Sequence, residues 1–205
     1  MKKILVAYAT MAGSTAEVAQ AVGEEITKTG LEVDVKPIND VRNLEGYDGV
    51  VVGAPMIMGW HRDAKRFLKR HRVELKRIPF AVFVLAMSLT QTGEMSVDSV
   101  TFYMDENLPK PPQKMGSLTF RERYARLSNY LRPILSATRP AKPVSIGVFG
   151  GRLEYGRLKW WAVLFAMLII RAPAGERRNW PIIRSWAEAL PVTLQLEEKK
   201  TAEVS

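Results

Sequence analysis

A short loop of small and hydroxyl-bearing residues near the start of the chain carries the clearest chemistry in the sequence. An apolar run from Ile4 to Ala7 leads into it, and apolar residues then recur at spacings of three and four. This pattern predicts a buried strand, a tight loop and an amphipathic helix. Backbone N–H groups and hydroxyls in such a loop converge beside the positive end of a helix, so we expect an anion site, with phosphate as the usual anion. The loop consists of Thr10, Met11, Ala12, Gly13, Ser14 and Thr15.

The same residues also fit an ordinary strand–helix turn in which Ser14 or Thr15 only caps the helix. The loop is not the glycine-rich dinucleotide fingerprint, because Gly13 is its one glycine. It is not a Walker loop either, because no Gly-Lys-Thr follows. The spacing alone therefore leaves a phosphate site and a plain turn both open.

Composition narrows the chemistry further. The 205 residues carry a formal net charge of +9, with no cysteine and two histidines. These counts exclude disulfides, thiolate catalysis and cysteine-ligated metals, and we expect no metal site. The positive charge favours acidic partners such as a carboxylate substrate or anionic lipid. Nucleic acid is not expected, because no binding module is recognisable and the aromatic residues do not interleave with the basic ones.

Five predicted strands alternate with amphipathic stretches, which favours an α/β fold with a parallel sheet. Four of them are mainly apolar, and 31–35 alternates apolar and acidic residues, as expected for a half-buried edge strand. The predicted strands lie at 4–7, 31–35, 49–54, 80–87 and 143–149, and the later helices at 62–77, 119–137 and 178–196. Residues 88–117 break the pattern, and we expect a long insert that forms a lid or a partly disordered loop. Residues 1–200 are expected to form one domain.

The stretch 7–17, Ala-Tyr-Ala-Thr-Met-Ala-Gly-Ser-Thr-Ala-Glu, resembles the FMN-phosphate loop of the flavodoxin family, in which a Gly-x-Thr loop joins a strand to a helix. The order of predicted elements fits the same family. The resemblance implies a flavodoxin-like, doubly wound, five-stranded parallel sheet of order 2-1-3-4-5 with helices on both faces. It also implies non-covalent FMN at the switch point, beyond the carboxyl ends of the strands.

Three further segments resemble one branch of that family, the bacterial FMN-dependent protoporphyrinogen dehydrogenases and their flavodoxin-like relatives. They are 52–61, Val-Gly-Ala-Pro-Met-Ile-Met-Gly-Trp-His; 150–160, Gly-Gly-Arg-Leu-Glu-Tyr-Gly-Arg-Leu-Lys-Trp; and 175–180, Gly-Glu-Arg-Arg-Asn-Trp.

The resemblance implies cofactor contacts outside the phosphate loop. Apolar side chains after the third strand would stack on the isoalloxazine ring, and backbone groups near Gly59 would bond flavin N5 and tune its potential. The alternative is that Met56 and Met58 are core residues and Trp60 contacts a partner. Polar groups after the fourth strand would face the pyrimidine edge. The expected contacts are Pro55, Met56, Ile57, Met58, Gly59 and Trp60, then Ser88, Leu89 and Thr90, then Gly150, Gly151 and Arg152.

The residues next to the ring loop have two interpretations. His61 is a candidate proton carrier, although a lone histidine is more often structural. Arg62, Lys65 and Arg66 start a strongly basic helix, which is either a solvated face or a surface that steers substrate carboxylates.

An apolar run, Trp160 to Ile170, lies in an expected helix at about 157–171 and is too short for a bilayer, which needs about 20 residues. It is either buried under the sheet or interfacial, with tryptophan at the headgroups of an anionic membrane. No signal peptide is visible, so we expect a cytoplasmic protein, or a peripheral one on the inner face of the membrane.

The resemblance implies an FMN-dependent oxidoreductase that takes two electrons from a reduced substrate, with protoporphyrinogen IX as the leading candidate, and passes them to a quinone. Two alternatives stay open. One is a flavodoxin-type electron carrier, against which the positive charge argues, because by resemblance that family is usually acidic. The other is a flavin-free adaptor on a membrane or protein surface.

Overall fold

A six-stranded parallel sheet organises the computed structural model, which describes residues 1–56, 59–94, 96–97, 100–114, 116–153 and 175–196. Its order is β2-β1-β3-β4-β10-β8. The strands are β1 Lys3–Tyr8, β2 Glu32–Pro37, β3 Gly49–Pro55, β4 Phe80–Ala86, β8 Tyr103–Met104 and β10 Ser145–Gly150. The first five positions reproduce the predicted order 2-1-3-4-5, and the sixth strand is an addition.

The position of each strand follows from its side chains. β3 and β4 are buried along their whole length, as expected for continuous β-branched and aromatic runs in a parallel sheet. β2 alternates acidic and apolar residues and forms one edge. Gly53 is needed at the centre, because a Cβ there would lie 1.9 Å from the ring of Phe83.

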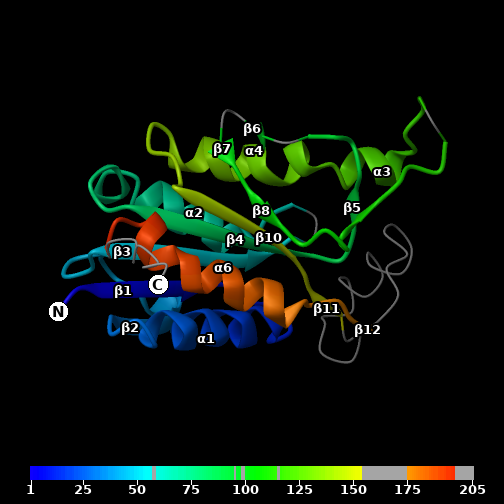
Figure 1. Ribbon diagram of the computed structural model, residues 1–205. Coiled ribbons are helices and arrows are strands. Elements are labelled where there is room, and N and C mark those ends of the chain that lie inside the picture. The colour runs from blue at the N-terminus through cyan, green and yellow to red at the C-terminus, as the bar shows by residue number, and fades with distance from the viewer. Residues whose placement is uncertain (57–58, 95, 98–99, 115, 154–174, 197–205) are drawn as a thin grey trace, which may run out of the picture.

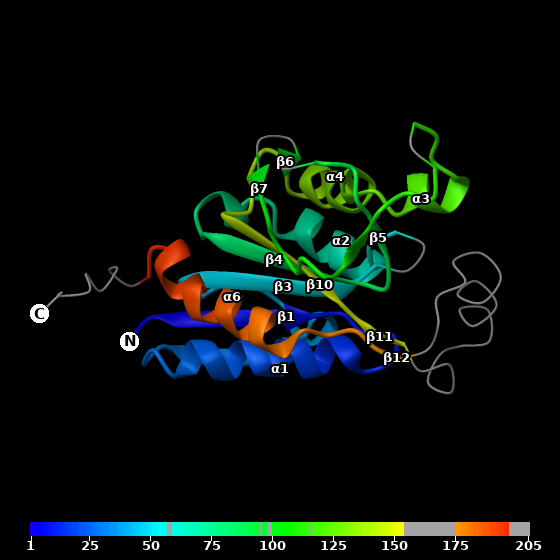
Figure 2. The same cartoon turned by 45° about the vertical axis from the view of Figure 1, so that its right-hand side comes forward.

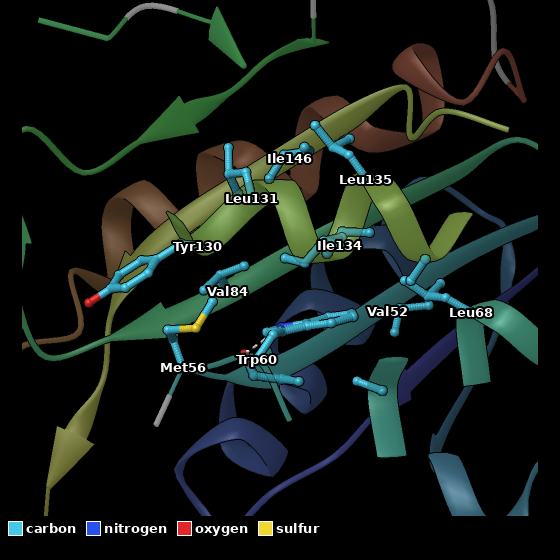
Figure 3. Packing of buried hydrophobic residues seen from close by; sticks show 14 of the residues in the cluster. Val52, Met56, Trp60, Leu68, Val84, Tyr130, Leu131, Ile134, Leu135 and Ile146 are labelled. Carbon is cyan, nitrogen blue, oxygen red and sulfur yellow. Dashed lines mark hydrogen bonds between the residues drawn. The ribbon is translucent and has the colours of Figure 1, made fainter. Parts of the chain in front are cut away.

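Helices cover both faces of the sheet (Figure 1). α1 Ser14–Thr27 and α6 Trp180–Thr193 pack on one face, where Val18, Val22 and Ile183 meet Val6 and Phe83. α2 Arg62–Arg70 and α4 Leu127–Thr138 pack on the other. On that second face, Leu131 and Ile134 of α4 lie against Val84 and Ile146 (Figure 3).

Two helices are shorter than predicted. The helix expected over 62–77 ends at Arg70, and a turn and the short 3₁₀ helix η2 Glu74–Lys76 follow. The helix expected over 119–137 is divided at Ala125 into α3 Phe120–Tyr124 and α4. A capping box between Thr119 and Glu122 fixes the start of α3.

The described part of the 88–117 insert is folded into the molecule and is not a free loop. It supplies β8 to the sheet edge and two small ladders: β5 Leu89–Thr90 pairs with β9 Pro109–Lys110, and β6 Ser96–Val97 pairs with β7 Val100–Thr101. Its Glu94 carboxylate accepts hydrogen bonds from the Arg126 guanidinium and from Ser128, at the start of α4. The alternative of a partly disordered loop is therefore wrong for these described residues, and the alternative of a lid stays a prediction.

A two-residue antiparallel ladder lies beyond the carboxyl end of β10. It pairs β11 Arg152–Leu153 with β12 Gly175–Glu176, at the same end of the molecule as β5 and α3 (Figure 2). The Trp160 to Ile170 run lies outside the described residues. Within the described parts of the chain, no helix combines the length and apolarity that a membrane crossing requires.

Candidate functional site

The loop between β1 and α1 has the backbone geometry of an anion cradle. Gly13 is the N-cap of α1 and has a φ of 93°, in the left-handed region that glycine adopts without strain. Its N–H donates to Thr10 Oγ1 at 2.9 Å, and its carbonyl accepts from the N–H groups of Ala16 and Glu17. The N–H groups of Ser14 and Thr15 open the helix, where amides have no intrahelical acceptor. These amides are available to an anion.

Thr15 supplies a sharper test of what this loop binds. Its side chain is 0% exposed, and its hydroxyl has no hydrogen-bond partner among the residues that the structure describes. Leaving a buried hydroxyl unpaired costs about 1–3 kcal/mol, so such groups normally have an acceptor or donor. Neither Ser14 nor Thr15 caps α1 through its side chain, so the plain-turn interpretation leaves this hydroxyl unexplained. A phosphate oxygen at the cradle would satisfy it, and the residues fit that group.

A narrow hollow brings together three of the loops expected from the sequence. The phosphate loop contributes Met11, Ala12 and Ser14, the end of β3 contributes Pro55 and Met56, and the end of β10 contributes Gly151 and Arg152. The hollow encloses about 30 Å³, which is room for about one water-sized group and too little to enclose a planar ring system.

Leu85 and Met87 also line this hollow, and sequence reasoning assigned neither of them a role. The available signal was their position, because they end the apolar run at 80–87, and the carboxyl ends of parallel strands meet at one edge.

The loop after β3 departs from its predicted role at Trp60. This residue forms a bridge with Met56, and its indole is 1% exposed within the core under α4 (Figure 3). Its Nε1–H donates to the Ala54 carbonyl at 3.3 Å. A buried ring cannot stack on a flavin, so Trp60 is a core residue here, and the expected ring contact is wrong for it. Ile57 and Met58 lie outside the described residues.

Gly59 is held by a distant residue. Its N–H donates to the Tyr124 hydroxyl of α3 at 2.7 Å, so this amide already has an acceptor. Its φ of 94° again requires the left-handed region. The amide that we expected near flavin N5 is thus positioned by Tyr124.

The predicted contacts after β4 lie away from this hollow. Thr90 Oγ1 donates to the Glu122 carbonyl at 2.9 Å, and the Ser88 carbonyl accepts from the Tyr130 hydroxyl at 2.8 Å. Leu89 and Thr90 are buried in the β5–β9 ladder. None of Ser88, Leu89 and Thr90 lines the hollow, so the structure does not join them to the phosphate loop.

Glycine allows the β11–β12 ladder to approach the hollow. A Cβ on Gly150 would lie 1.9 Å from the Arg177 carbonyl oxygen, so the close passage of the two backbones requires glycine there. Gly151 donates to the Ala86 carbonyl and accepts from the Arg177 N–H, each at 3.0 Å. The Arg177 guanidinium donates to the Met87 carbonyl at 2.7 Å.

Arg178 forms ion pairs with two carboxylates beside the phosphate loop. Its side chain is 2% exposed and donates to Glu17 Oε2 in the first turn of α1 at 2.7 Å and to Glu176 Oε2 at 2.6 Å. It also lies 4.6 Å from the centre of the Trp180 ring. The hydrogen bond from Arg178 lowers the pKa of Glu176. The resemblance over 175–180 implies no role for Arg177 or Arg178, whose adjacent charges were the available signal.

His61 and its neighbours form the start of α2. The His61 Nδ1 accepts from the Asp63 N–H at 3.3 Å and caps the helix, and burial lowers the pKa of the imidazole. Arg62 and Arg66 are exposed, Lys65 is half-buried, and Arg66 lies 3.5 Å from Asp63. Throughout the described ranges, no group of three histidine and acidic side chains could hold a metal ion.

Comparison with known proteins identifies the family of the chain. A flavodoxin domain model matches residues 5–178. Protoporphyrinogen IX dehydrogenase [quinone] of Escherichia coli K12 is 25% identical over 177 residues, which cover 85% of this chain and 82% of that protein. The protein of that name from Escherichia coli O157:H7 matches with the same figures.

Among solved structures, two-electron reduced flavodoxin from Megasphaera elsdenii superposes with a TM-score of 0.50 and 11% identity, covering 94% of this chain and 98% of the flavodoxin. At that identity the likeness supports the fold alone.

Proposed function

We propose, since the chain belongs to the flavodoxin domain family, that it binds FMN non-covalently and acts as an FMN-dependent oxidoreductase. The observation that carries this proposal is the buried hydroxyl of Thr15 in the first turn of α1, which has no hydrogen-bond partner among the described residues. A phosphate ester supplies the missing acceptor, and a flavin-free adaptor would have no use for it.

The flavin, when bound, supplies the two-electron chemistry, while the chain supplies binding and orientation. The Thr10–Thr15 loop would hold the phosphate. Met11, Pro55, Met56 and Met87 would form the apolar wall below the ring. Gly150, Gly151 and Arg152 would close the hollow from the β10 side.

The substrate side of the proposal is a reduced donor, with protoporphyrinogen IX the leading candidate, and a quinone acceptor. It is supported by the match to the E. coli dehydrogenase over 85% of this chain. Arg62, Lys65 and Arg66 would steer donor carboxylates from the start of α2. His61 is the proposed proton carrier. His61→Asn keeps a good N-cap, so it should leave the thermal midpoint unchanged while lowering turnover.

An electron carrier without its own substrate is the second candidate, supported by the match of residues 5–178 to the flavodoxin domain model. The two differ in what reduces and reoxidises the protein. We expect the purified protein to show a flavin absorbance spectrum. Anaerobic protoporphyrinogen should then reduce it, and a menaquinone analogue should reoxidise it with turnover. A colourless protein that takes up no FMN would overturn the cofactor assignment. FMN-loaded protein that is inert to both reagents, and that titrates in two separate one-electron steps, would favour the carrier.

We also propose that the protein binds an anionic membrane surface through Trp160, Trp161 and the basic residues beside them. Flotation with liposomes containing anionic phospholipid tests this directly. Capture should weaken in Trp160→Ser and Trp161→Ser variants, whereas unchanged capture would count against the interfacial helix.

A further inference from the structure

A second and larger cavity lies between the 88–117 insert and α3. It encloses about 320 Å³, at the lower end of the range of small-molecule sites. We call it the Phe120 pocket. Its walls include Leu89, Lys110, Phe120, Arg121, Glu122 and Tyr124. In both views, α3 and β5 lie at the same end of the sheet as β11 and β12 (Figures 1 and 2).

The charges on this wall are unbalanced. Lys110 and Arg121 have no ion-pair or side-chain hydrogen-bond partner among the described residues. Glu122 is the one acid on the wall, and its oxygens accept from the Gln113 N–H at 2.6 Å and from the Thr119 N–H and hydroxyl at 2.7 and 2.8 Å. These hydrogen bonds, from Gln113 first, lower the pKa of Glu122. Because this carboxylate is engaged with its own loop, the two cations remain available to an anion from outside.

An aromatic surface accompanies the two cations. Phe120 is 67% exposed, an unusual position for a phenyl ring in a folded domain. It is the first residue of α3, and the capping box between Thr119 and Glu122 fixes the helix at that point. The backbone that carries the ring is thereby fixed at the pocket wall, and the exposed ring offers a face for stacking.

A neighbouring cavity provides an internal comparison. It encloses about 380 Å³ and shares Leu89 and Thr90 with the Phe120 pocket. Its described walls carry Glu94 and Glu106 and no lysine or arginine. An anion would therefore distinguish two cavities of similar size by charge alone.

Tyr124 connects the Phe120 pocket to the candidate cofactor site. Its side chain forms part of the wall, and its hydroxyl accepts from the Gly59 N–H at 2.7 Å. Ser88 lines the pocket, and the preceding residue, Met87, lines the hollow beside the phosphate loop. A ligand in the pocket would therefore lie next to the loops that surround the hollow.

We propose that the Phe120 pocket binds an aromatic carboxylate, with the ring against Phe120 and the carboxylate on Lys110 and Arg121. The ring supplies the apolar surface that covers Phe120, and the carboxylate replaces the partner that the two cations lack. This binding goes beyond the proposed function and does not rest on it.

Calorimetric titration of the full-length protein with 2-naphthoate tests the proposal. We expect saturable binding to the wild type, weakened about tenfold by Arg121→Gln and by Phe120→Ser. Lys110→Gln should weaken it in the same direction. The control is Arg123→Gln, which removes the same charge from the same short helix at an exposed position that does not line the pocket. It should change the affinity less than twofold. Neutral 2-naphthamide should bind with no dependence on Arg121.

Three results would overturn the proposal: no saturable binding of 2-naphthoate by the wild type, equal weakening by Arg121→Gln and Arg123→Gln, or equal binding of the amide and the acid. Thermal midpoints of the variants check that each is folded. Flavin absorbance of the same samples separates the two proposals. A protein that binds 2-naphthoate but takes up no FMN would contradict the proposed function and leave the Phe120 pocket proposal intact. A protein that takes up FMN but does not bind 2-naphthoate would contradict the pocket proposal and leave the proposed function intact.

Discussion

On the phosphate side of the candidate site, Thr10, Gly13 and Thr15 lie within six consecutive residues, and the bond from Gly13 to Thr10 spans three. On the ring side, Gly59 is held by Tyr124, which is 65 residues away, and Met56 is held by the Leu85 carbonyl of the adjacent strand end. The first half is therefore made by local backbone conformation, and the second by tertiary packing of the insert and α3.

We expect the two sides to have separate roles, one in FMN affinity and the other in redox properties. The phosphate side depends on a left-handed glycine and a helix start, which any strand–helix unit of this kind can form. The ring side depends on which residues later in the chain reach the loop after β3. We therefore expect changes on the phosphate side to alter FMN affinity, and changes on the ring side to alter redox properties with little effect on affinity.

The largest expected effect comes from Gly13→Asp. A carboxylate would lie against the phosphate, and a side chain at a φ of 93° adds about 1–3 kcal/mol of strain. FMN affinity, measured by flavin fluorescence titration, should fall about 100-fold or more. Gly30→Asp is the matched control, because Gly30 has a φ of 89° and open space around it at the other end of α1. Equal FMN affinity in the two variants would show that strain, and not the phosphate, explains the loss.

The second largest effect is expected from Thr15→Val, which should preserve or raise the stability of the FMN-free protein and lower its FMN affinity. The change removes a buried hydroxyl without a partner, so the FMN-free protein should be as stable as the wild type or up to about 1 kcal/mol more stable in urea unfolding. FMN affinity should fall about tenfold, because the phosphate loses a donor. Thr138→Val is the control, since its buried hydroxyl donates to the Leu135 carbonyl. It should destabilise the protein by about 1 kcal/mol and leave FMN affinity unchanged. The reverse pattern would contradict the role given to Thr15.

The sequence supported a correct prediction of the sheet because β1, β3, β4 and β10 are largely apolar runs, whose burial needs no distant information, and the alternating pattern of β2 marks an edge strand. The cradle was predictable for the same local reason, from Gly13 and the hydroxyls around it. Trp60 was misassigned because an aromatic residue after a strand is equally suited to stack on a ligand or to fill the core. The space under α4 decides between these, and residues 70 positions later create that space. β8 and the β5–β9 ladder were missed because two-residue strands carry no periodicity.

A smaller effect is expected from Arg178→Gln. This change leaves the Glu17 carboxylate without its buried partner beside the phosphate loop, so FMN affinity should fall about fivefold by like-charge repulsion. In the Glu17→Gln/Arg178→Gln double variant the repulsion is absent, and the affinity should return to within about twofold of wild type. Arg184→Gln is the control, because it breaks a similar pair between α6 and α1, with Glu25, away from the cradle. No recovery in the double variant would mean that Arg178 acts by holding the β11–β12 ladder and not by neutralising Glu17.

Tyr124→Phe should have the smallest effect on affinity and the most specific consequence. It frees the Gly59 N–H, whose hydrogen bond to the phenol is worth about 0.5–1.5 kcal/mol. FMN affinity should stay within about twofold of wild type, because the phosphate side is untouched. The two-electron midpoint potential should shift by about 10–30 mV, since 30 mV corresponds to about 1.4 kcal/mol for two electrons. Tyr47→Phe, which removes a phenol bonded to Asp34 at the β2 edge, should leave the potential unchanged. A large loss of FMN affinity in Tyr124→Phe would break the separation of the two sides, because the ring loop would then be part of what holds the cofactor.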